Sequence, residues 1–447
     1  MSSERADRIF HRRMDRRDFL WLLTASVGAS ALEGCAVDPV TGQQTLMLMS
    51  ESQEISIDQQ QSPQQFSSDY GPVQDASVNA YLSEVGNRLA RLSHRPGMPY
   101  SFRAVNASYV NAYAFPGGSI AATRGILAEI DNEAELGALL GHEIGHVNAR
   151  HTAEHASKTM ITQVAVAGVG IAAQVSGFGG LGSLAEDIGN IGAGALLAHY
   201  SRENEREADA LGMEYLHRAG LNPDGMVGLH EILQRQSRER PSAIELMFST
   251  HPMSDERVAN AREAMRSRYA GDRALPLNRE RYQDQTAGVR RIKGALQAMQ
   301  RADTDMRKKE YSRAEQELGQ ALKQAPNDYA ALVMMSKCQL ALERPDQAQR
   351  YASQAKSVYP REAQGHRVGA VSSLMRRDYD RAYQDLNTYD RLLPGNADIA
   401  FLKGVSLEGM QNHQGAAREY ARYVKAVPQG SQSRYAVQRL QKWGYLR

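Results

Sequence analysis

The sequence has little cysteine, little tryptophan and almost no excess of charge of either sign. Its 447 residues include two cysteines and two tryptophans, and 53 Lys and Arg residues nearly balance 51 Asp and Glu residues, for a net charge of +2. Cys35 and Cys338 stand in unrelated contexts, so a disulfide framework is not expected. A nearly neutral chain has no bulk attraction for an acidic polymer, so we expect no nucleic-acid partner.

Long hydrophobic runs are also missing. The apolar run from Phe19 to Leu32 is shorter than the ~20 residues that a membrane-spanning helix needs. Hydrophobic residues make up 42% of the chain and charged residues 23%, as in ordinary globular proteins. This composition excludes a wholly disordered, a collagen-like and a multi-span membrane protein. At ~150 residues per domain, the chain is long enough for about three units.

Residues 1–34 have the features of an export signal. Four arginines between positions 12 and 17 precede the apolar run, and small residues follow it. Within this segment Asp15-Arg16-Arg17-Asp18-Phe19-Leu20 resembles the twin-arginine export motif, although arginine-rich starts also serve the general export route. The alternative is a basic tail followed by a core helix.

A lipid anchor is expected directly after this segment. Leu32-Glu33-Gly34-Cys35 resembles a bacterial lipobox, in which the cysteine becomes the lipidated N-terminus. A lipid on Cys35 would tether the chain to a membrane that it does not span. Ala36 rather than aspartate at the next position resembles the lipoproteins that are sorted to the outer membrane. We therefore expect a periplasmic protein, lipid-anchored to the membrane at the inner leaflet of the outer membrane.

Local patterns divide the rest of the chain. Apolar residues recur at helical spacing over 77–92, 126–150 and 201–219, and the alternation between Tyr100 and Ser119 predicts strands. The predicted boundaries are 1–34 for the signal, 35–70 for a polar lipid-anchored tether, 71–268 for a first folded domain, 269–293 for a polar linker and 294–447 for a repeat domain.

A 34-residue repeat fills the C-terminal third. Each unit ends near a proline, with an alanine twelve residues before the proline and a small residue twenty-four residues before it. The prolines are Pro326, Pro360, Pro394 and Pro428, and the alanines are Ala314, Ala348, Ala382 and Ala416. The small residues are Ala302, Ser336, Ala370 and Gly404. A proline that ends a helix pair, with small residues where two helices cross, explains the pattern. It resembles tetratricopeptide repeats and predicts four units from about Gly294, followed by a capping helix. Such repeats form a curved scaffold that binds peptides or proteins, and a scaffold without a specific ligand is the alternative.

The strongest chemical motif is His142-Glu143-Ile144-Gly145-His146, within the predicted helix over 126–150. Residues at i and i+4 share one helix face, so both imidazoles can bind one metal ion. Glu143 is then placed as the general base that activates water against a polarised carbonyl. The apolar residues before the motif predict that it is buried, and a buried glutamate between two histidines is hard to explain without a metal. A surface helix with incidental histidines is the alternative.

A tetrahedral zinc site also needs a third protein ligand. Three glutamates of the predicted helix over 201–219 compete for this role, Glu203, Glu205 and Glu207. Spacing favours Glu205, because it shares a helix face with Asp209, whose carboxylate could then hydrogen-bond the far nitrogen of a histidine ligand. Glu203 and Glu207 are expected to be solvated charges.

These two motifs together, His142 to His146 and Glu205-Arg206-Glu207-Ala208-Asp209, resemble the M48 metallopeptidase family. The resemblance covers Cys35 to about Tyr269, and the family includes bacterial periplasmic peptidases with C-terminal tetratricopeptide repeats. It implies a zincin-type domain with a small β-sheet, one zinc ion per chain and metalloendopeptidase activity. The expected fold is therefore α+β and predominantly helical, with an α-solenoid of repeats after the peptidase domain.

Two further segments resemble parts of that family's active site. Asn111-Ala112-Tyr113-Ala114 resembles its edge strand, which would hold an extended substrate by strand addition, with an ordinary hairpin as the alternative. Ser249-Thr250-His251-Pro252 also resembles the family's pattern. This resemblance implies that His251 caps the zinc site and keeps the enzyme latent. Alternatively, His251 or Arg257 could stabilise the oxyanion that forms on the scissile carbonyl. Arg257, like Asp209, is otherwise expected beside the ligands rather than among them.

Three features stay outside this scheme. If the helix continued past His146, His151 would lie about 140° around the axis from it. We therefore expect His151 and His155 to be solvated or capping residues. The stretch 164–197 is rich in glycine and alanine, which favours a packed helical hairpin, with a lid over the site or a membrane-surface contact as alternatives.

The function that these features favour is a zinc metalloendopeptidase of the cell envelope. Its substrates would be misfolded or stalled envelope and outer-membrane proteins, which the repeats would recruit. The alternative is a chaperone or assembly scaffold whose repeats dock onto outer-membrane assembly machinery and whose zinc site is largely latent. A zinc-dependent hydrolase of a non-peptide substrate would gain nothing from the edge strand or the repeats.

Overall fold

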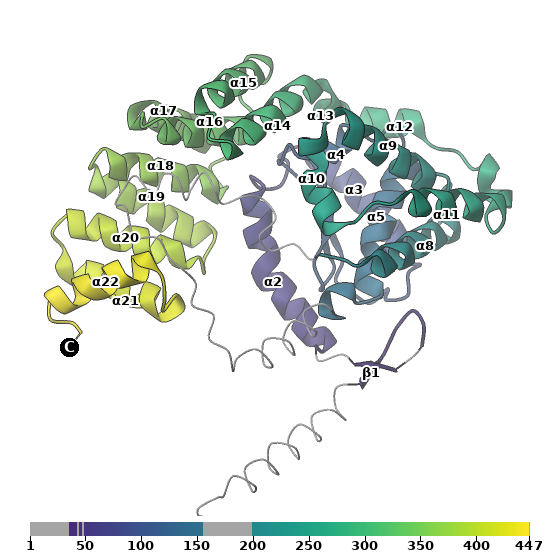
Figure 1. The fold of residues 1–447 in the computed structure, drawn as a ribbon, viewed down its shortest axis with the longest axis horizontal. Coiled ribbons are helices and arrows are strands. Elements are labelled where there is room, and N and C mark those ends of the chain that lie inside the picture. The colour runs from purple at the N-terminus through teal and green to yellow at the C-terminus, as the bar shows by residue number, and fades with distance from the viewer. Residues whose placement is uncertain (1–34, 43, 47–48, 155–198, 447) are drawn as a thin grey trace, which may run out of the picture.

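The computed structural model describes residues 35–42, 44–46, 49–154 and 199–446, and it confirms the predicted α+β class by the many helices and two small sheets of these ranges (Figure 1). The predicted export signal and the glycine-rich stretch lie outside the described residues. Cys35 begins strand β1 (Cys35–Val37), which pairs antiparallel with β2 (Gln44–Leu46). In the described ranges, every helix is too short or too polar to cross a membrane.

The small sheet of the first domain has three strands. They are β3 (Ser101–Val105), β4 (Ala112–Ala114) and β5 (Ser119–Thr123), in the order β3-β5-β4. β3 runs parallel to β5, and β4 runs antiparallel to it. β4 therefore lies at an edge of the sheet, as expected for the segment that begins at Asn111.

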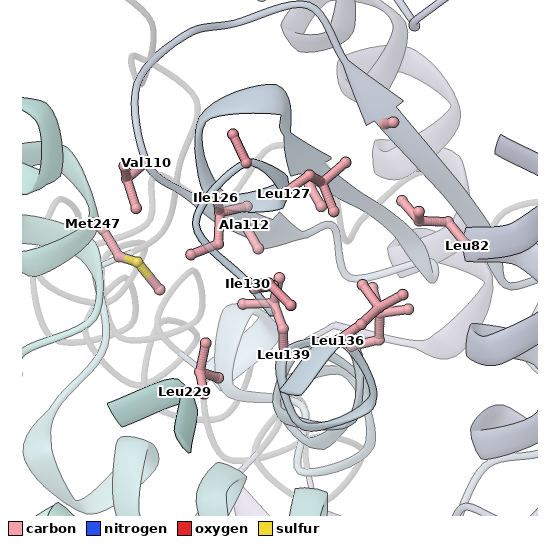
Figure 2. Close-up of a cluster of buried hydrophobic side chains, with 14 of the residues drawn as sticks. Leu82, Val110, Ala112, Ile126, Leu127, Ile130, Leu136, Leu139, Leu229 and Met247 are labelled. Atoms are coloured by element: carbon pink, nitrogen blue, oxygen red, sulfur yellow. The ribbon is translucent and has the colours of Figure 1, made fainter. Parts of the chain in front are cut away.

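Helices from distant parts of the sequence pack around this sheet. They are α3 (Ala76–Ala90), α4 (Arg124–Leu127), α5 (Glu133–Asn148), α8 (Arg202–Arg218), α9 (Gly225–Glu239), α10 (Pro241–Thr250) and α11 (Asp255–Arg266). Figure 2 shows side chains of several of these elements converging in one core, among them Leu82, Ala112, Ile126, Leu136, Leu139, Leu229 and Met247. Because this core joins β4, α5, α9 and α10, it fixes the elements that carry the chemical motifs relative to one another.

The helix predicted over 126–150 is interrupted. α4 ends at Leu127, and α5 starts anew where the side chain of Asn132 accepts a hydrogen bond from the Glu135 amide (3.0 Å). Every residue of α5 is buried, which confirms the burial that its apolar flank predicted.

Residues expected to form a tether are instead helix α2 (Glu51–Ser68), which Figure 1 shows between the sheet-containing domain and the repeats. Ser50 and Gln53 start it with a capping box. Its buried residues are polar, so apolar periodicity could not reveal the helix; they are Glu54, Asp58, Ser62, Gln65 and Ser67. A helix with so little apolar surface depends on tertiary contacts for its stability.

Those contacts tie α2 to both domains. On one side, Glu54 forms buried ion pairs with Arg95 (2.7 Å) and Arg150 (2.9 Å) of the sheet-containing domain. On the other side, Ser67 donates a hydrogen bond to Glu362 of the repeat domain. Each buried polar group of this set has a partner, which is the condition for burying it without a large loss of stability.

The carboxylate after α2 gives a prediction for stability. Asp69 is buried and accepts hydrogen bonds from Gln65, Tyr109 and Tyr113, but burial outweighs these bonds and raises the pKa of Asp69 to about 6. Because the folded state holds this proton more tightly than the unfolded state, the ionised carboxylate disfavours folding above pH 6, and that cost fades as pH falls through about 6 towards 3.8. Asp69→Asn should therefore stabilise the protein by about 1–3 kcal/mol at pH 7.5 and by less at pH 5, in urea unfolding. Asp75→Asn, at an exposed helix cap, is the control, and equal destabilisation of Asp69→Asn at both pH values would contradict the prediction.

The segment expected to be a linker is a packed connection. Residues 269–293 include η1 (Ala270–Ala274), α12 (Arg279–Gln285) and α13 (Ala287–Arg291). Tyr282 is fully buried, and its hydroxyl donates to the Leu127 carbonyl (2.7 Å). The polar composition suggested exposure, but these polar groups find partners on the first domain. One core consequently runs from the sheet-containing domain into the first repeats.

The repeat domain consists of paired helices, and the second helices of successive pairs begin 34 residues apart. The paired helices are α14 (Lys293–Arg307), α15 (Tyr311–Gln324), α16 (Tyr329–Ala341), α17 (Pro345–Val358), α18 (Ala363–Met375), α19 (Tyr379–Leu392), α20 (Ala397–Gly409) and α21 (His413–Ala426), capped by α22 (Ser431–Lys442). The turn inside each pair contains one residue with φ between 57° and 60°, at positions 309, 343, 377 and 411. The four predicted alanines are fully buried, and a Cβ on Gly404 would fall 2.5 Å from the Tyr420 ring. The predicted four units and capping helix are confirmed.

Candidate metal centre

Small residues bring the two helices of the centre together. A Cβ on Gly141 of α5 would lie 3.2 Å from the Gly212 backbone of α8, and one on Gly145 would lie 3.0 Å from the Ala208 backbone. This close approach places the side chains of both helices within reach of one another. The glycine within the histidine motif therefore has a packing role beside the chemical role of its neighbours.

Four buried side chains converge where α5, α8 and the end of α10 meet. His142, His146, Glu205 and His251 each offer one donor atom, and these atoms all lie within 4.8 Å of one another. The Nε2 atoms of His142 and His146 are 3.1 Å apart, and the Glu205 carboxylate lies 3.5 and 3.3 Å from them. His251 Nδ1 is 3.0 Å from Glu205 and 3.4 Å from His142 Nε2.

This donor set fits a zinc ion. Four ligands at the usual ~2.0–2.1 Å around a tetrahedral ion are about 3.3 Å from one another, close to the spacing of these atoms. Two imidazole nitrogens that face each other at 3.1 Å are satisfied together when a cation lies between their lone pairs. Imidazole and carboxylate are also the ligand types that zinc prefers.

The charges around the centre shift the pKa values of the candidate ligands. Burial by itself would raise the pKa of Glu205, but His251 and His142 hold the pKa of this carboxyl well below its usual range. Burial lowers the pKa of His142, yet Glu205 and Asp209 outweigh burial and raise it to about 10. Burial lowers the pKa of His146 well below its usual range. Shifts of this size, in opposite directions within one cluster, are typical of functional sites.

A second layer of charge surrounds the ligands. An Asp209 carboxylate oxygen lies 2.9 Å from His142 Nδ1, the ring nitrogen that does not face the centre. The guanidinium of Arg257 binds both Asp209 oxygens (2.7 and 2.8 Å) and lies 2.6 Å from Glu205. His230 Nε2 approaches Asp209 at 3.2 Å. The structure thus places Asp209 and Arg257 beside the ligands, and it adds His230, which sequence patterns did not reveal.

The three competing glutamates are in different environments. Glu205 is fully buried at the centre, whereas the Glu203 side chain is 75% exposed and pairs with Arg206. The Glu207 side chain is 35% exposed, and its carboxylate also lies 3.3 Å from His151, a contact that the sequence did not predict. The expectation for His151 was wrong: it is 3% exposed, and its Nδ1 lies 2.9 Å from His146 Nδ1. His155 lies outside the described residues.

An aromatic ring, that of Tyr200, packs against the candidate metal centre. Tyr200 stacks on His146 with the ring centroids 3.7 Å apart, and its hydroxyl lies 3.0 Å from Thr152. The Tyr200 amide donates to the Thr250 carbonyl (3.0 Å), next to His251. Sequence reasoning missed Tyr200, since nothing in its neighbours predicts contact with a helix more than fifty residues earlier.

Comparisons with known proteins agree with this geometry. The pattern described as peptidase family M48 matches residues 76–265, and a tetratricopeptide-repeat pattern matches residues 305–370. The chain is 32% identical over 194 residues to the beta-barrel assembly-enhancing protease of Yersinia pestis, a match that covers 42% of this chain and 39% of that protein. The chain thus spans about two fifths of the length of that relative.

Two other relatives match over most of their own length. Metalloprotease YcaL of Escherichia coli (strain K12) is 30% identical over 199 residues, which cover 42% of this chain and 74% of that protein. Metalloprotease LoiP of the same organism is 32% identical over 197 residues, with the same two coverages of 42% and 74%.

Proposed function

Because the chain belongs to peptidase family M48, we propose that it is a zinc-dependent endopeptidase of the bacterial cell envelope. The observation that carries this proposal is the buried cluster of His142, His146 and Glu205, with the carboxylate of Glu143 beside it. These three residues would hold the ion. Zinc there would act as a Lewis acid that polarises the substrate carbonyl and makes a water molecule more acidic.

Glu143 is the residue that would move the proton. Its two carboxylate oxygens are buried and have no hydrogen-bond partner in the described part of the chain. Burial raises the pKa of Glu143, which makes its carboxylate a stronger proton acceptor. Glu143 would take a proton from the attacking water and deliver it to the amine nitrogen that leaves when the peptide C–N bond breaks.

The position of β4 at the end of the strand order supports a peptide as the substrate. Asn111 and Phe115 bond to β5 through the Thr123 amide and the Ser119 carbonyl, so Tyr113 between them also faces β5. The alternation leaves the N–H and C=O groups of Ala112 and Ala114 pointing away from β5. A substrate strand added there would pair with these two alanines, whose small side chains permit close approach.

The position of His251 supports a latent state. Its Nδ1 lies among the three ligand atoms at spacings that suit a fourth zinc ligand. A catalytic zinc needs an open position for water, whereas four protein ligands close the site. We propose that His251 fills this position at rest and must withdraw before cleavage, with oxyanion stabilisation as its alternative role.

Replacing His251 with alanine tests the function and the latency together. We expect the purified wild-type protein to contain one zinc per chain and to cleave casein slowly, and His251→Ala to cleave it about 10-fold faster at similar zinc content. The measurements are metal analysis and initial cleavage rates, with the exposed His217→Ala as the control. Loss of activity in His251→Ala would instead favour the oxyanion role, and a wild-type protein without zinc would contradict the proposed function.

The proposed cellular role depends on the expected anchor and the repeats. A lipid on Cys35 would hold the chain in the periplasm at the outer membrane, and the repeats would recruit unfolded or stalled envelope proteins, or bind outer-membrane assembly machinery. The relative named beta-barrel assembly-enhancing protease supports this substrate class. The position of His251 beside the three proposed zinc ligands favours one second function. The protein would then be a chaperone or assembly scaffold with a largely latent zinc site.

A further inference from the structure

The most informative group that the proposed chemistry leaves unused is the pair of buried His151 and half-buried Glu207. We propose that His151 is a positioning residue for the zinc ligand His146, and that Glu207 in turn orients His151. This inference rests on the proposed function, because it concerns how one ligand of the proposed zinc ion is held. It assigns a role to two residues that their sequence context marks as solvated.

A turn in the backbone after α5 places His151 next to His146. α5 ends at Asn148, and Arg150 adopts φ 57°, a left-handed conformation that is uncommon outside glycine. The Arg150 side chain is held in an ion pair with Glu54 of α2 (2.9 Å) and donates to the Met49 carbonyl. The chain therefore leaves the helix axis after Asn148, and His151 folds back against His146 instead of continuing around the helix.

The hydrogen-bond directions form one consistent chain. His146 Nε2 faces the metal centre, so the proton of its neutral imidazole is on Nδ1. That N–H points to His151 Nδ1 at 2.9 Å, which must then be the acceptor. The proton of His151 is consequently on Nε2, which donates to Glu207 at 3.3 Å. A second-layer acceptor of this kind fixes the tautomer and the ring orientation of a metal ligand.

The two histidine ligands are thus held differently. His142 Nδ1 lies 2.9 Å from the carboxylate of Asp209 itself, whereas the Nδ1 of His146 is linked to the carboxylate of Glu207 through His151. His151 is 3% exposed, and the Glu207 side chain is 35% exposed at the surface end of the chain of bonds. Tyr200 stacks on the His146 ring, so two faces of this ligand are supported by residues outside the zinc-binding set.

The test compares His151→Phe with His151→Asn in the full chain. Phenylalanine fills the space but offers no acceptor, whereas the Oδ1 of asparagine can take the place of Nδ1. We expect the zinc affinity of His151→Phe to fall about 10- to 100-fold and that of His151→Asn to stay within about threefold of wild type. Affinity is measured by competition with a chromophoric chelator. The visible spectrum of the cobalt-substituted protein should shift in His151→Phe and be restored in His151→Asn.

A second pair of variants covers the case in which His151→Phe does not fold, which thermal unfolding of the metal-free protein would show. Glu207→Leu should weaken zinc binding about threefold, and Glu203→Leu, on the exposed side of the same helix, should not change it. Unchanged affinity and cobalt spectrum in His151→Phe, or equal effects of the two glutamate variants, would overturn the inference while zinc binding by the wild type still stands. A wild-type protein that binds no zinc would overturn the proposed function and this inference together.

Discussion

Glu143→Gln is expected to lower kcat/KM for peptide cleavage by about 10³-fold and to leave zinc binding intact. The amide has nearly the same shape as the carboxylate but cannot accept the proton of the attacking water. Because neither oxygen of Glu143 has a hydrogen-bond partner in the described ranges, the substitution breaks no bond that holds the fold. The loss should therefore appear in catalysis and not in thermal stability.

The assay needs three readouts on the same preparations: zinc per chain, thermal midpoint and initial rate of casein cleavage. Glu203→Gln is a matched control, since it removes one carboxylate from an exposed position near the centre. More than a tenth of wild-type activity in a zinc-loaded Glu143→Gln protein would show that another group moves the proton. In cells, survival of the protein's role in this variant would favour the scaffold function, and its loss would favour proteolysis.

Glu205→Gln is expected to weaken zinc binding by at least about 100-fold and to abolish cleavage with it. An ionised carboxylate is a far better zinc ligand than a neutral amide. The substitution also removes the negative charge that Arg257 contacts at 2.6 Å and that His251 contacts at 3.0 Å. The guanidinium of Arg257 would then oppose a divalent ion at the same place, without the carboxylate that offsets its charge.

The neighbouring glutamates supply the controls for this experiment. Glu203→Gln changes an exposed residue, and Glu207→Gln keeps an acceptor for His151, so both should bind zinc within about threefold of wild type. The measurement is chelator competition on each purified variant. Retained zinc affinity in Glu205→Gln, together with its loss in either control, would move the third ligand to that other glutamate.

Sequence patterns predicted the elements whose structure depends on residues that are close together in the sequence. The spacing of His142 and His146 places both on one face of any α-helix, whatever surrounds it. The 34-residue period of prolines and small residues likewise reflects contacts between successive helices, so four repeats and their cap could be predicted. Helix α2 escaped this reasoning because its buried side chains are polar. The connection over 269–293 escaped it because buried Tyr282 depends on a partner far away in the sequence, the Leu127 carbonyl.

The candidate metal centre also contains both residues that local sequence patterns predict and residues that only tertiary contacts place. Sequence alone predicted the His142–His146 pair, Glu143 as the general base and a short list of glutamates for the third ligand. Only the tertiary structure decided that Glu205 faces the histidines, because the approach of α5 and α8 depends on small residues on both helices. It also decided that His151 is buried against His146, since a left-handed turn at Arg150, held by an ion pair to α2, redirects the chain after the helix. The position of a side chain after such a turn depends on contacts between distant segments, and no local period encodes them.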